Sequence, residues 1–190
     1  VQQFGTAANV PVPTGLSGSR IVEVGGGVQH SIALREDGHI VAWGNNSAGQ
    51  ATVPQLPAGL RYVSASASTW HNVAIRSDGT AVAWGSNTWQ QCNVPALPAG
   101  TLYLDAKALP KESVYLRSDN VIVRRGYYNT QHSSYQTPAT PPGVRYVAIA
   151  GGDGAYLCAL RSDGEAVVWP SVAHLPSGQD APPLPWGVYY

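Results

Sequence analysis

The apolar and polar positions of the chain repeat with a period of about 41 residues. Each repeat opens with a short apolar run such as IVEVGGG, continues with a second run such as HSIALRED, and then has a third, such as IVAWG, that is apolar at successive positions. Short apolar runs bounded by Gly, Asp and Pro are typical of β-strands, so the pattern predicts three strands in each repeat. The repeats start at Ile21, Tyr62, Tyr103, Tyr146 and Tyr190, at spacings of 41, 41, 43 and 44 residues.

A tight turn is predicted between the second and third runs of each repeat. Asp-Gly is a strong signal for a two-residue type I′ hairpin, because both residues tolerate a positive φ. We therefore interpret the four aspartates as turn residues rather than as a carboxylate array, and expect the arginine two positions before each to pair with it. The turns are Asp37-Gly38, Asp78-Gly79, Asp119-Asn120 and Asp163-Gly164, and the arginines are Arg35, Arg76, Arg117 and Arg161.

The repeat predicts an all-β fold. The 190 residues include 21 Gly and 15 Pro, a composition rich in turn formers. Runs that are apolar at successive positions suit a sheet covered on both faces, so each repeat has to stack against copies of itself. This favours a β-propeller of four-stranded blades, each of about 41 residues, over a β-solenoid. We expect one repeat domain over residues 1–190, with a partial blade at 1–20 and full blades at 21–61, 62–102, 103–145 and 146–190.

The phrase HSIALREDGHIVAWGNNSAGQ, at residues 30–50, resembles the repeat of the regulator of chromosome condensation, a β-propeller family that usually has seven blades. The form AWGNNSAGQATVP is similar to the bacterial branch that includes the secreted type-II β-lactamase-inhibitory protein. The resemblance is strong over residues 21–102 and weaker beyond them, where Arg125 and Pro170 replace the repeated Trp and Gly. It implies a secreted, non-catalytic protein-binding propeller. It also implies a structural hydrogen bond, within or between blades, for His30 and His71.

The chain of 190 residues is too short for seven repeats of this length. Three explanations remain open: a piece of a longer propeller, a short ring with one reduced blade, or several chains that complete one another's sheets. An open propeller leaves unpaired strand edges and apolar blade faces that have to be covered. We therefore favour association with other copies or other segments.

Charge and composition count against several function classes. Lys and Arg together number 11, as do Asp and Glu, so we expect neither a nucleic-acid nor a membrane partner. No apolar run approaches the length of a membrane span. The chain lacks Met and a signal-like start, as expected for a mature or trimmed product. No motif for a nucleophile, a metal or a phosphate occurs, so we predict no enzyme activity, no metal and no cofactor.

The two cysteines, Cys92 and Cys158, occupy different phases of repeats that are not neighbours. One pair in 190 residues is not the disulfide framework of a small secreted domain, and we expect both thiols to be unbridged. Cys158 lies in an apolar run, which predicts a small buried core residue.

The loops that follow the third apolar run differ between repeats, whereas the apolar runs recur, so we predict that these loops recognise a partner. After the Trp-Gly phrase the first repeat has the small and polar NNSAGQATV, whereas the second has SNTWQQCNV and the third YYNTQHSSYQT. Trp and Tyr on rigid loops are typical of binding hot spots, since they bury a large area with few rotatable bonds. The candidate partner-binding residues are Trp70, Trp89, Tyr127, Tyr128, His132 and Tyr135, with Leu109-Pro110-Lys111 as an additional opening loop.

The sequence therefore predicts an extracellular, non-catalytic propeller that recognises a protein partner through aromatic loops on one face. An enzyme inhibitor is the special case that the resemblance implies. The first alternative is a structural or assembly protein whose incomplete propeller closes between copies of the chain. The second is a carbohydrate-binding lectin, although a lectin is expected to repeat its pocket in every blade and these loops differ.

Overall fold

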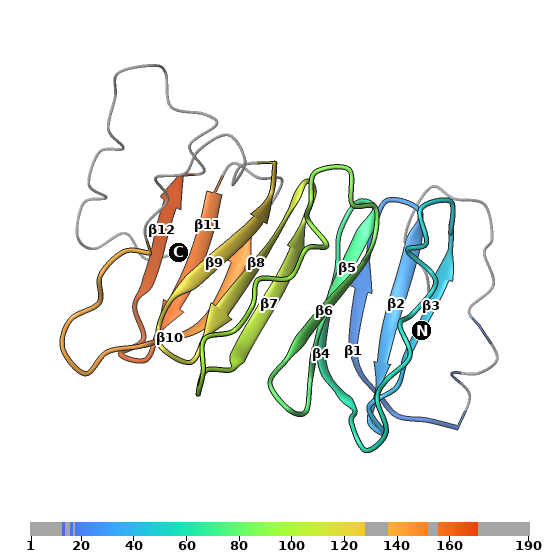
Figure 1. Cartoon of the computed structure of the whole chain (residues 1–190), viewed down its shortest axis with the longest axis horizontal. Helices are drawn as coiled ribbons and strands as arrows, with labels where there is room; N and C mark the ends of the chain where they lie inside the picture. The colour runs from blue at the N-terminus through green and yellow to red at the C-terminus, as the bar shows by residue number, and fades with distance from the viewer. Residues whose placement is uncertain (1–12, 14–15, 17, 128–136, 152–155, 171–190) are drawn as a thin grey trace.

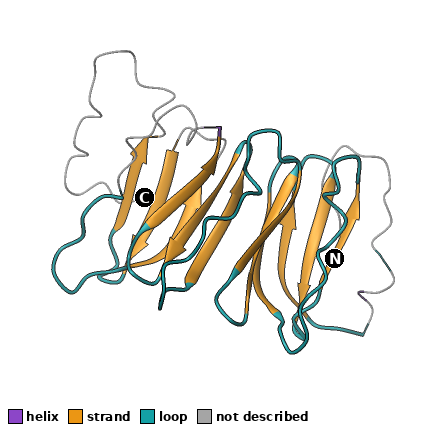
Figure 2. Ribbon diagram, viewed as in Figure 1, coloured by secondary structure: helices purple, strands orange, loops and turns teal. Residues whose placement is uncertain are grey.

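The computed structural model describes residues 13, 16, 18–127, 137–151 and 156–170. Within these residues the chain forms twelve β-strands in four sheets, which lie in one row in chain order (Figure 1). Turns and extended segments connect the strands (Figure 2). The all-β prediction is confirmed.

Each sheet is an antiparallel meander in which the second strand pairs with the first and the third. The first sheet contains β1 (Ile21–Gly26), β2 (His30–Arg35) and β3 (Ile40–Gly44), and the second contains β4 (Tyr62–Ala67), β5 (His71–Arg76) and β6 (Ala81–Gly85). The third contains β7 (Tyr103–Leu109), β8 (Glu112–Arg117) and β9 (Ile122–Gly126), and the fourth contains β10 (Tyr146–Gly151), β11 (Tyr156–Arg161) and β12 (Ala166–Pro170). The first and third strands are therefore the edges of every sheet.

The turn between the second and third strands has three residues, so the predicted two-residue type I′ turn is wrong. In the first sheet Leu34 pairs with Ile40, and the amide of Gly38 donates to the carbonyl of Arg35 at 2.9 Å. Gly38 has a φ of +84°, whereas the aspartate before it is not left-handed. This is a three-residue hairpin loop closed by one left-handed residue. Asn120 takes that position in the third sheet, with a φ of +68°.

The predicted pairing of arginines with turn aspartates occurs at three of the four turns. Ion pairs join Arg35 to Asp37, Arg117 to Asp119 and Arg161 to Asp163. At the second turn Asp78 instead accepts hydrogen bonds from the amide and the hydroxyl of Thr80, at 2.9 and 2.7 Å. The aspartates thus stabilise the hairpin turns through these ion pairs and hydrogen bonds.

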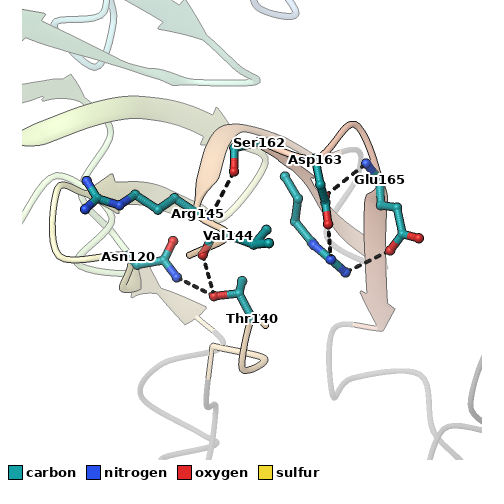
Figure 3. A network of polar contacts seen from close by, with 8 residues as sticks. Asn120, Thr140, Val144, Arg145, Ser162, Asp163 and Glu165 are labelled. Atoms are coloured by element: carbon teal, nitrogen blue, oxygen red, sulfur yellow. Dashed lines mark hydrogen bonds and ion pairs between the residues drawn. The ribbon is translucent and has the colours of Figure 1, made fainter. Parts of the chain in front are cut away.

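A polar network joins the third and fourth sheets beside these hairpins (Figure 3). The side-chain amide of Asn120 donates to Thr140 Oγ1 at 2.9 Å, and the Thr140 hydroxyl donates to the carbonyl of Val144 at 2.8 Å. The amide of Arg145 donates to Ser162 Oγ at 3.0 Å. The turn of the third sheet is thereby tied to the chain that enters the fourth sheet, and Ser162 ties that chain to the fourth sheet's own turn.

Apolar cores fill the three spaces between successive sheets. Each core combines the second strand of one sheet with the first strand of the next, and every first strand after β1 contributes a buried Tyr. The central residues are Ile32, Leu34 and Tyr62 in the first core, Val73, Ile75 and Tyr103 in the second, and Leu116, Tyr146 and Ile149 in the third. Trp43 and Trp84 are buried, and the side chain of Trp169 lies outside the described residues.

Side chains of one sheet also satisfy backbone amides of the next. Alternate amides of an edge strand have no partner within their own sheet. Glu23 Oε2 accepts from the amide of Ala65, and Asp105 Oδ2 accepts from the amide of Ile149, both at 2.8 Å. These carboxylates therefore stabilise the stacking.

The four-stranded blade is not confirmed, because each sheet has three strands within the described residues. In the first two repeats the segments after the third strand, residues 45–61 and 86–102, form turns and extended chain. The first and last sheets lie at opposite ends of the row (Figure 1). The described part of the chain is therefore an open row, and the predicted partial blade at 1–20 lies mostly outside it.

Both cysteines are free, but Cys158 is not the buried core residue predicted. It is half-buried, whereas its neighbours Leu157 and Ala159 are buried. Cys158 pairs with Ala150 in the register that Val114 has in the third sheet, and this face points toward the next position in the row. Val114 is buried by the fourth sheet, whereas no further sheet covers the face of Cys158 within the described residues, so the prediction was wrong.

Candidate protein-binding site

The strands of all four sheets terminate at two opposite edges of the row, which we call the turn end and the loop end. The turn end carries the hairpins between second and third strands. The loop end, at the upper edge of Figure 1, carries the hairpins between first and second strands together with the start of each segment that follows a third strand. Antiparallel pairing brings these loops together, since His71 at the start of β5 pairs with Gly85 at the end of β6, and Glu112 pairs with Gly126.

The loop that carries Trp89 is held by a buried glutamine. The amide of Trp89 donates to Gln91 Oε1 at 2.8 Å, and the amide of Cys92 donates to Asn87 Oδ1 at 2.9 Å. Gln90 is left-handed, with a φ of +63°, a conformation that a non-glycine residue keeps only where its surroundings fix it. Trp89, a residue that is 39% exposed, is therefore presented from a hydrogen-bonded backbone.

The same frame carries a different residue in the first repeat. There the amide of Ala48 donates to Oε1 of the buried Gln50 at 2.8 Å, as that of Trp89 does to Gln91. The hydrogen bond to a buried glutamine is thus shared by the first two repeats, whereas only the second repeat presents an exposed indole, that of Trp89, from this loop.

Trp89, Tyr127 and Lys111 form one cluster, although they come from two repeats. The Trp89 and Tyr127 ring centroids are 4.8 Å apart and the planes are inclined by 84°, an edge-to-face contact. The Lys111 ammonium lies 5.2 Å from the centre of the Tyr127 ring and 5.9 Å from that of Trp89, within the range of cation–π attraction. The amide of Tyr127 donates to the carbonyl of Lys111 at 3.0 Å, which fixes these two residues relative to each other.

The structure brings together two of the six predicted site residues, Trp89 and Tyr127. Trp70 lies at the same end, 37% exposed, and within the described residues its ring contacts no other aromatic ring. The remaining candidates, Tyr128, His132 and Tyr135, lie outside the described residues. Lys111, which the sequence suggested only as part of an opening loop, belongs to the cluster. It occupies in the third repeat the position of Trp70 in the second.

A buried chain of hydrogen bonds lies beneath the Trp89 loop. His71 Nε2 is 2.9 Å from Ser113 Oγ, and the Ser113 hydroxyl donates to the carbonyl of Gln91 at 2.8 Å. Because that hydroxyl proton is engaged, His71 Nε2 is the donor to Ser113 and its Nδ1 carries no proton. His30 makes the equivalent bond, to Asn72 Oδ1 at 2.7 Å.

These histidines are structural, as the resemblance implied. Burial lowers the pKa of His71 to about 4. Burial also lowers the pKa of His30, although its hydrogen bond to Asn72 opposes the shift. Both imidazoles are neutral at pH 7, and each uses its Nε2 proton to join one sheet to the next.

The third sheet replaces this arrangement with a buried ion pair. Glu112 stands at the position of His71, and the apolar Leu157 at the position of Ser113. Arg124 Nε donates to Glu112 Oε2 at 2.9 Å, and Arg124 Nη2 contacts Oε1 of the same carboxylate. Burial raises the pKa of Glu112, and the Arg124 hydrogen bond opposes that shift. This pair was not predicted from the sequence, although Arg124 replaces an Ala of the first two repeats.

Three further observations concern the described residues outside the cluster. Within the described residues, no group of three or more His, Cys, Asp or Glu side chains is placed to hold a metal. A shallow pocket at the turn end is lined by residues 119–122 and 137–140, and its Thr137 hydroxyl oxygen accepts from the amide of Ile122 at 2.9 Å. None of the described helices has the length and hydropathy needed to cross a membrane.

One repeat of the chain matches a family model, and the fold resembles several solved structures. The family model described as "Regulator of chromosome condensation (RCC1) repeat" matches residues 21–50. No curated protein matches the chain. Solved structures that resemble it include human WBSCR16, with a TM-score of 0.65 and 19% identity over 80% of this chain, and Prp20p from Saccharomyces cerevisiae, with 0.60 and 22% over 81%. Yeast RCC1 (Prp20) bound to Kap60 gives 0.61 and 21% over 84%.

The chain spans about half the length of these structures, between 45% and 48%. At these identities the likeness concerns the fold. The chain therefore contains a repeat that matches the RCC1 model, and its four stacked sheets have the fold of part of an RCC1-type β-propeller.

Proposed function

We propose that this chain is a non-catalytic, protein-binding member of the RCC1-type propeller family and that it binds its partner at the loop end. The observation that carries the proposal is the cluster of Trp89, Tyr127 and Lys111, which two repeats contribute and whose backbone is hydrogen-bonded in place. Aromatic side chains that are ordered before binding cost little entropy when a partner arrives.

Two solved neighbours support a protein as the partner class. Prp20p has binding properties toward Gsp1p and histones, and in a second structure the same yeast protein, RCC1 (Prp20), is bound to Kap60. Those partners belong to that protein, and the likeness supports only the use of such a frame for protein recognition. This chain has a feature consistent with protein recognition: two repeats share the same loop backbone, and the position that is Ala48 in the first repeat is the exposed Trp89 in the second.

Affinity capture with the whole chain as bait tests the proposal. A natural-source extract is passed over wild type, the double variant Trp89→Ala/Tyr127→Ala, and the control Arg20→Ala/Glu36→Ala, which removes an exposed ion pair at the turn end. We expect the wild type and the control to retain one protein that the cluster variant loses. Equal capture by the cluster variant would contradict the proposal. Release of the captured material by a simple sugar would support the lectin alternative instead.

A second candidate function is assembly between chains, and the outer face of the last sheet favours it. Leu160 and Val168 are 43% and 38% exposed there, whereas Leu116, the equivalent of Leu160 in the third sheet, is fully buried by β10. Exposed apolar patches of this kind are typical of interfaces. The proposed occupant is the first strand of a further repeat, from another copy of the chain or another segment.

Native mass spectrometry across a wide range of concentrations tests assembly. Association predicts species larger than the 20.0 kDa chain for the wild type and a shift toward 20.0 kDa for Leu160→Lys. A single 20.0 kDa species at every concentration would reject assembly between copies of this chain.

An extracellular location and an inhibitory role remain predictions from the sequence resemblance, and we propose both on that ground. Fractionation of the natural source tests the location, and recovery of the protein in the cytosol would refute it. If the captured partner is an enzyme, titration with this chain tests inhibition directly.

A further inference from the structure

We propose that the loop end recognises a carboxylate group of its protein partner, an Asp or Glu side chain that lies beside an apolar residue on an exposed segment, and that Lys111 is the group that binds it. The inference rests on the proposed function of the loop end and names the partner's chemistry.

Within the described residues, the distribution of carboxylates leaves the loop end open to a negative partner. All exposed carboxylates of the described residues lie in or next to the hairpins of the turn end: Glu36, Asp37, Asp78, Asp119, Asp163 and Glu165. The other three described carboxylates are used inside the molecule. Glu23 and Asp105 accept backbone amides of the next sheet, and Glu112 pairs with Arg124. A carboxylate that approaches Lys111 therefore meets no exposed acidic side chain within the described residues.

The Lys111 ammonium is positioned without being neutralised. It lies near the two aromatic rings, and none of the described carboxylates forms an ion pair with it. An ammonium group has three N–H donors, and a π face does not replace a carboxylate oxygen as their acceptor. Lys107 provides the contrast within the same repeat, because its ammonium already donates to Asp105 Oδ1 at 2.7 Å.

The exposed aromatic rings favour a partner that has an apolar side chain next to its carboxylate. Trp89 and Trp70 are both more than one-third exposed and offer apolar area at the loop end. A partner side chain that covers Trp89 also removes water from around Lys111, which strengthens a charge-assisted hydrogen bond formed there. An acidic residue next to an apolar one satisfies both features, whereas a neutral sugar leaves the ammonium unpaired.

Selection from a display library of random linear peptides on the immobilised whole chain tests the proposal. We expect enrichment of peptides that carry Asp or Glu next to Trp, Phe or Leu. Each enriched peptide is then titrated against the wild type, Lys111→Met, Lys111→Glu, Trp89→Ala and the control Arg20→Met, whose charge lies at the exposed turn end. Met keeps the apolar stem and removes only the charge, and thermal unfolding of every variant verifies that it is folded.

Loss of roughly tenfold or more in affinity for Lys111→Met, with no loss for Arg20→Met, is the expected result. Replacing the acidic peptide residue by Lys should restore binding to Lys111→Glu. Peptides that need Trp89 but lack an acid, or that bind Lys111→Met as tightly as wild type, would overturn the carboxylate inference and leave the proposed function standing. Peptides indifferent to both Trp89 and Lys111, or no enrichment, would overturn the proposed function as well. Competition by free glucuronate as effective as that by free peptide would assign the carboxylate to an acidic sugar and reject a protein partner.

Discussion

The hydroxyl of Ser113 donates a hydrogen bond to the carbonyl oxygen of Gln91 at 2.8 Å, although the two residues belong to different repeats. Gln91 in turn accepts the amide of Trp89 on its side-chain oxygen. The position of the exposed indole is therefore tied to the buried contact between the second and third sheets. The frame that stabilises the fold also orders the candidate binding loop.

Replacing Ser113 by Ala should loosen the Trp89 loop. The change removes the donor to Gln91 and leaves the buried His71 Nε2–H without its acceptor, at a cost of about 1–3 kcal/mol. We expect faster amide exchange over residues 86–92 while the strands stay protected. Hydrogen exchange read by mass spectrometry measures both.

Ser31→Ala is the matched control, since Ser31 holds the position of Ser113 in the first repeat. It should leave exchange over residues 86–92 as in the wild type. Unchanged exchange in Ser113→Ala would show that the Trp89 loop does not depend on the third sheet.

The free energy of unfolding should fall as pH falls below 6.5. Burial lowers the pKa of His71 to about 4 and lowers that of His30 below its ordinary value. Between pH 6.5 and 4 the unfolded chain therefore binds protons that the folded chain does not, which favours unfolding. His71 alone should cost roughly 2 kcal/mol between pH 7 and pH 5, measured by urea unfolding at the two pH values.

The variant His71→Gln separates this effect from other titrations, because a Gln amide can donate to Ser113 but does not titrate. Its stability should change less between pH 7 and pH 5 than that of the wild type. An identical pH dependence would refute the neutral, buried state of His71.

Breaking the buried ion pair of the third sheet should be costly. Arg124→Leu leaves the Glu112 carboxylate without its ion-pair partner. We expect the free energy of unfolding to fall by about 3–5 kcal/mol, as is typical when one partner of a buried ion pair is removed. The double variant Glu112→Leu/Arg124→Leu should recover most of the loss, since apolar residues replace a buried pair at little cost. Chemical denaturation gives both values. As the reference, Arg20→Leu breaks an exposed pair and should cost about 1 kcal/mol or less. Equal losses for Arg124→Leu and Arg20→Leu would contradict the importance of the buried pair.

Substitutions at Gly164, in the hairpin of the fourth sheet, test backbone strain without steric crowding. Gly164 has a φ of +89°, and a Cβ atom added there would meet no other atom within 4 Å. Gly164→Val should therefore destabilise the fold by about 1–2 kcal/mol through its backbone alone. Gly164→Asn should cost less, because Asn120 adopts this conformation in the third sheet. Thermal unfolding that gives the same midpoint for both variants would contradict the left-handed turn position.

Local patterns predicted the strands and the sites of the hairpins, because apolar runs and Asp-Gly pairs are local signals. The turn type was wrong because it depends on which residues close the loop, here Arg35 and His39, and Asp-Gly fits a loop of two residues or of three. The burial of Cys158 could not be predicted from an apolar run alone, because it depends on whether a further sheet covers the outer face of β11.

The candidate site was predictable in part. Trp89 and Tyr127 could be selected because aromatic residues in varying loops indicate binding. Their contact with Lys111 could not be predicted from the sequence, because it depends on the position of the second sheet relative to the third. The pair of Glu112 and Arg124 likewise depends on the register between β8 and β9.

Hydrogen exchange of the chain alone and in complex with its captured partner tests the central claim most directly, because it maps the binding surface without any substitution. Slower exchange in the complex over residues 68–70, 86–92 and 110–111, with unchanged hairpins at residues 36–38 and 77–79, is the predicted result. Protection confined to the turn end, or to the outer face of β11 and β12, would contradict binding at the loop end.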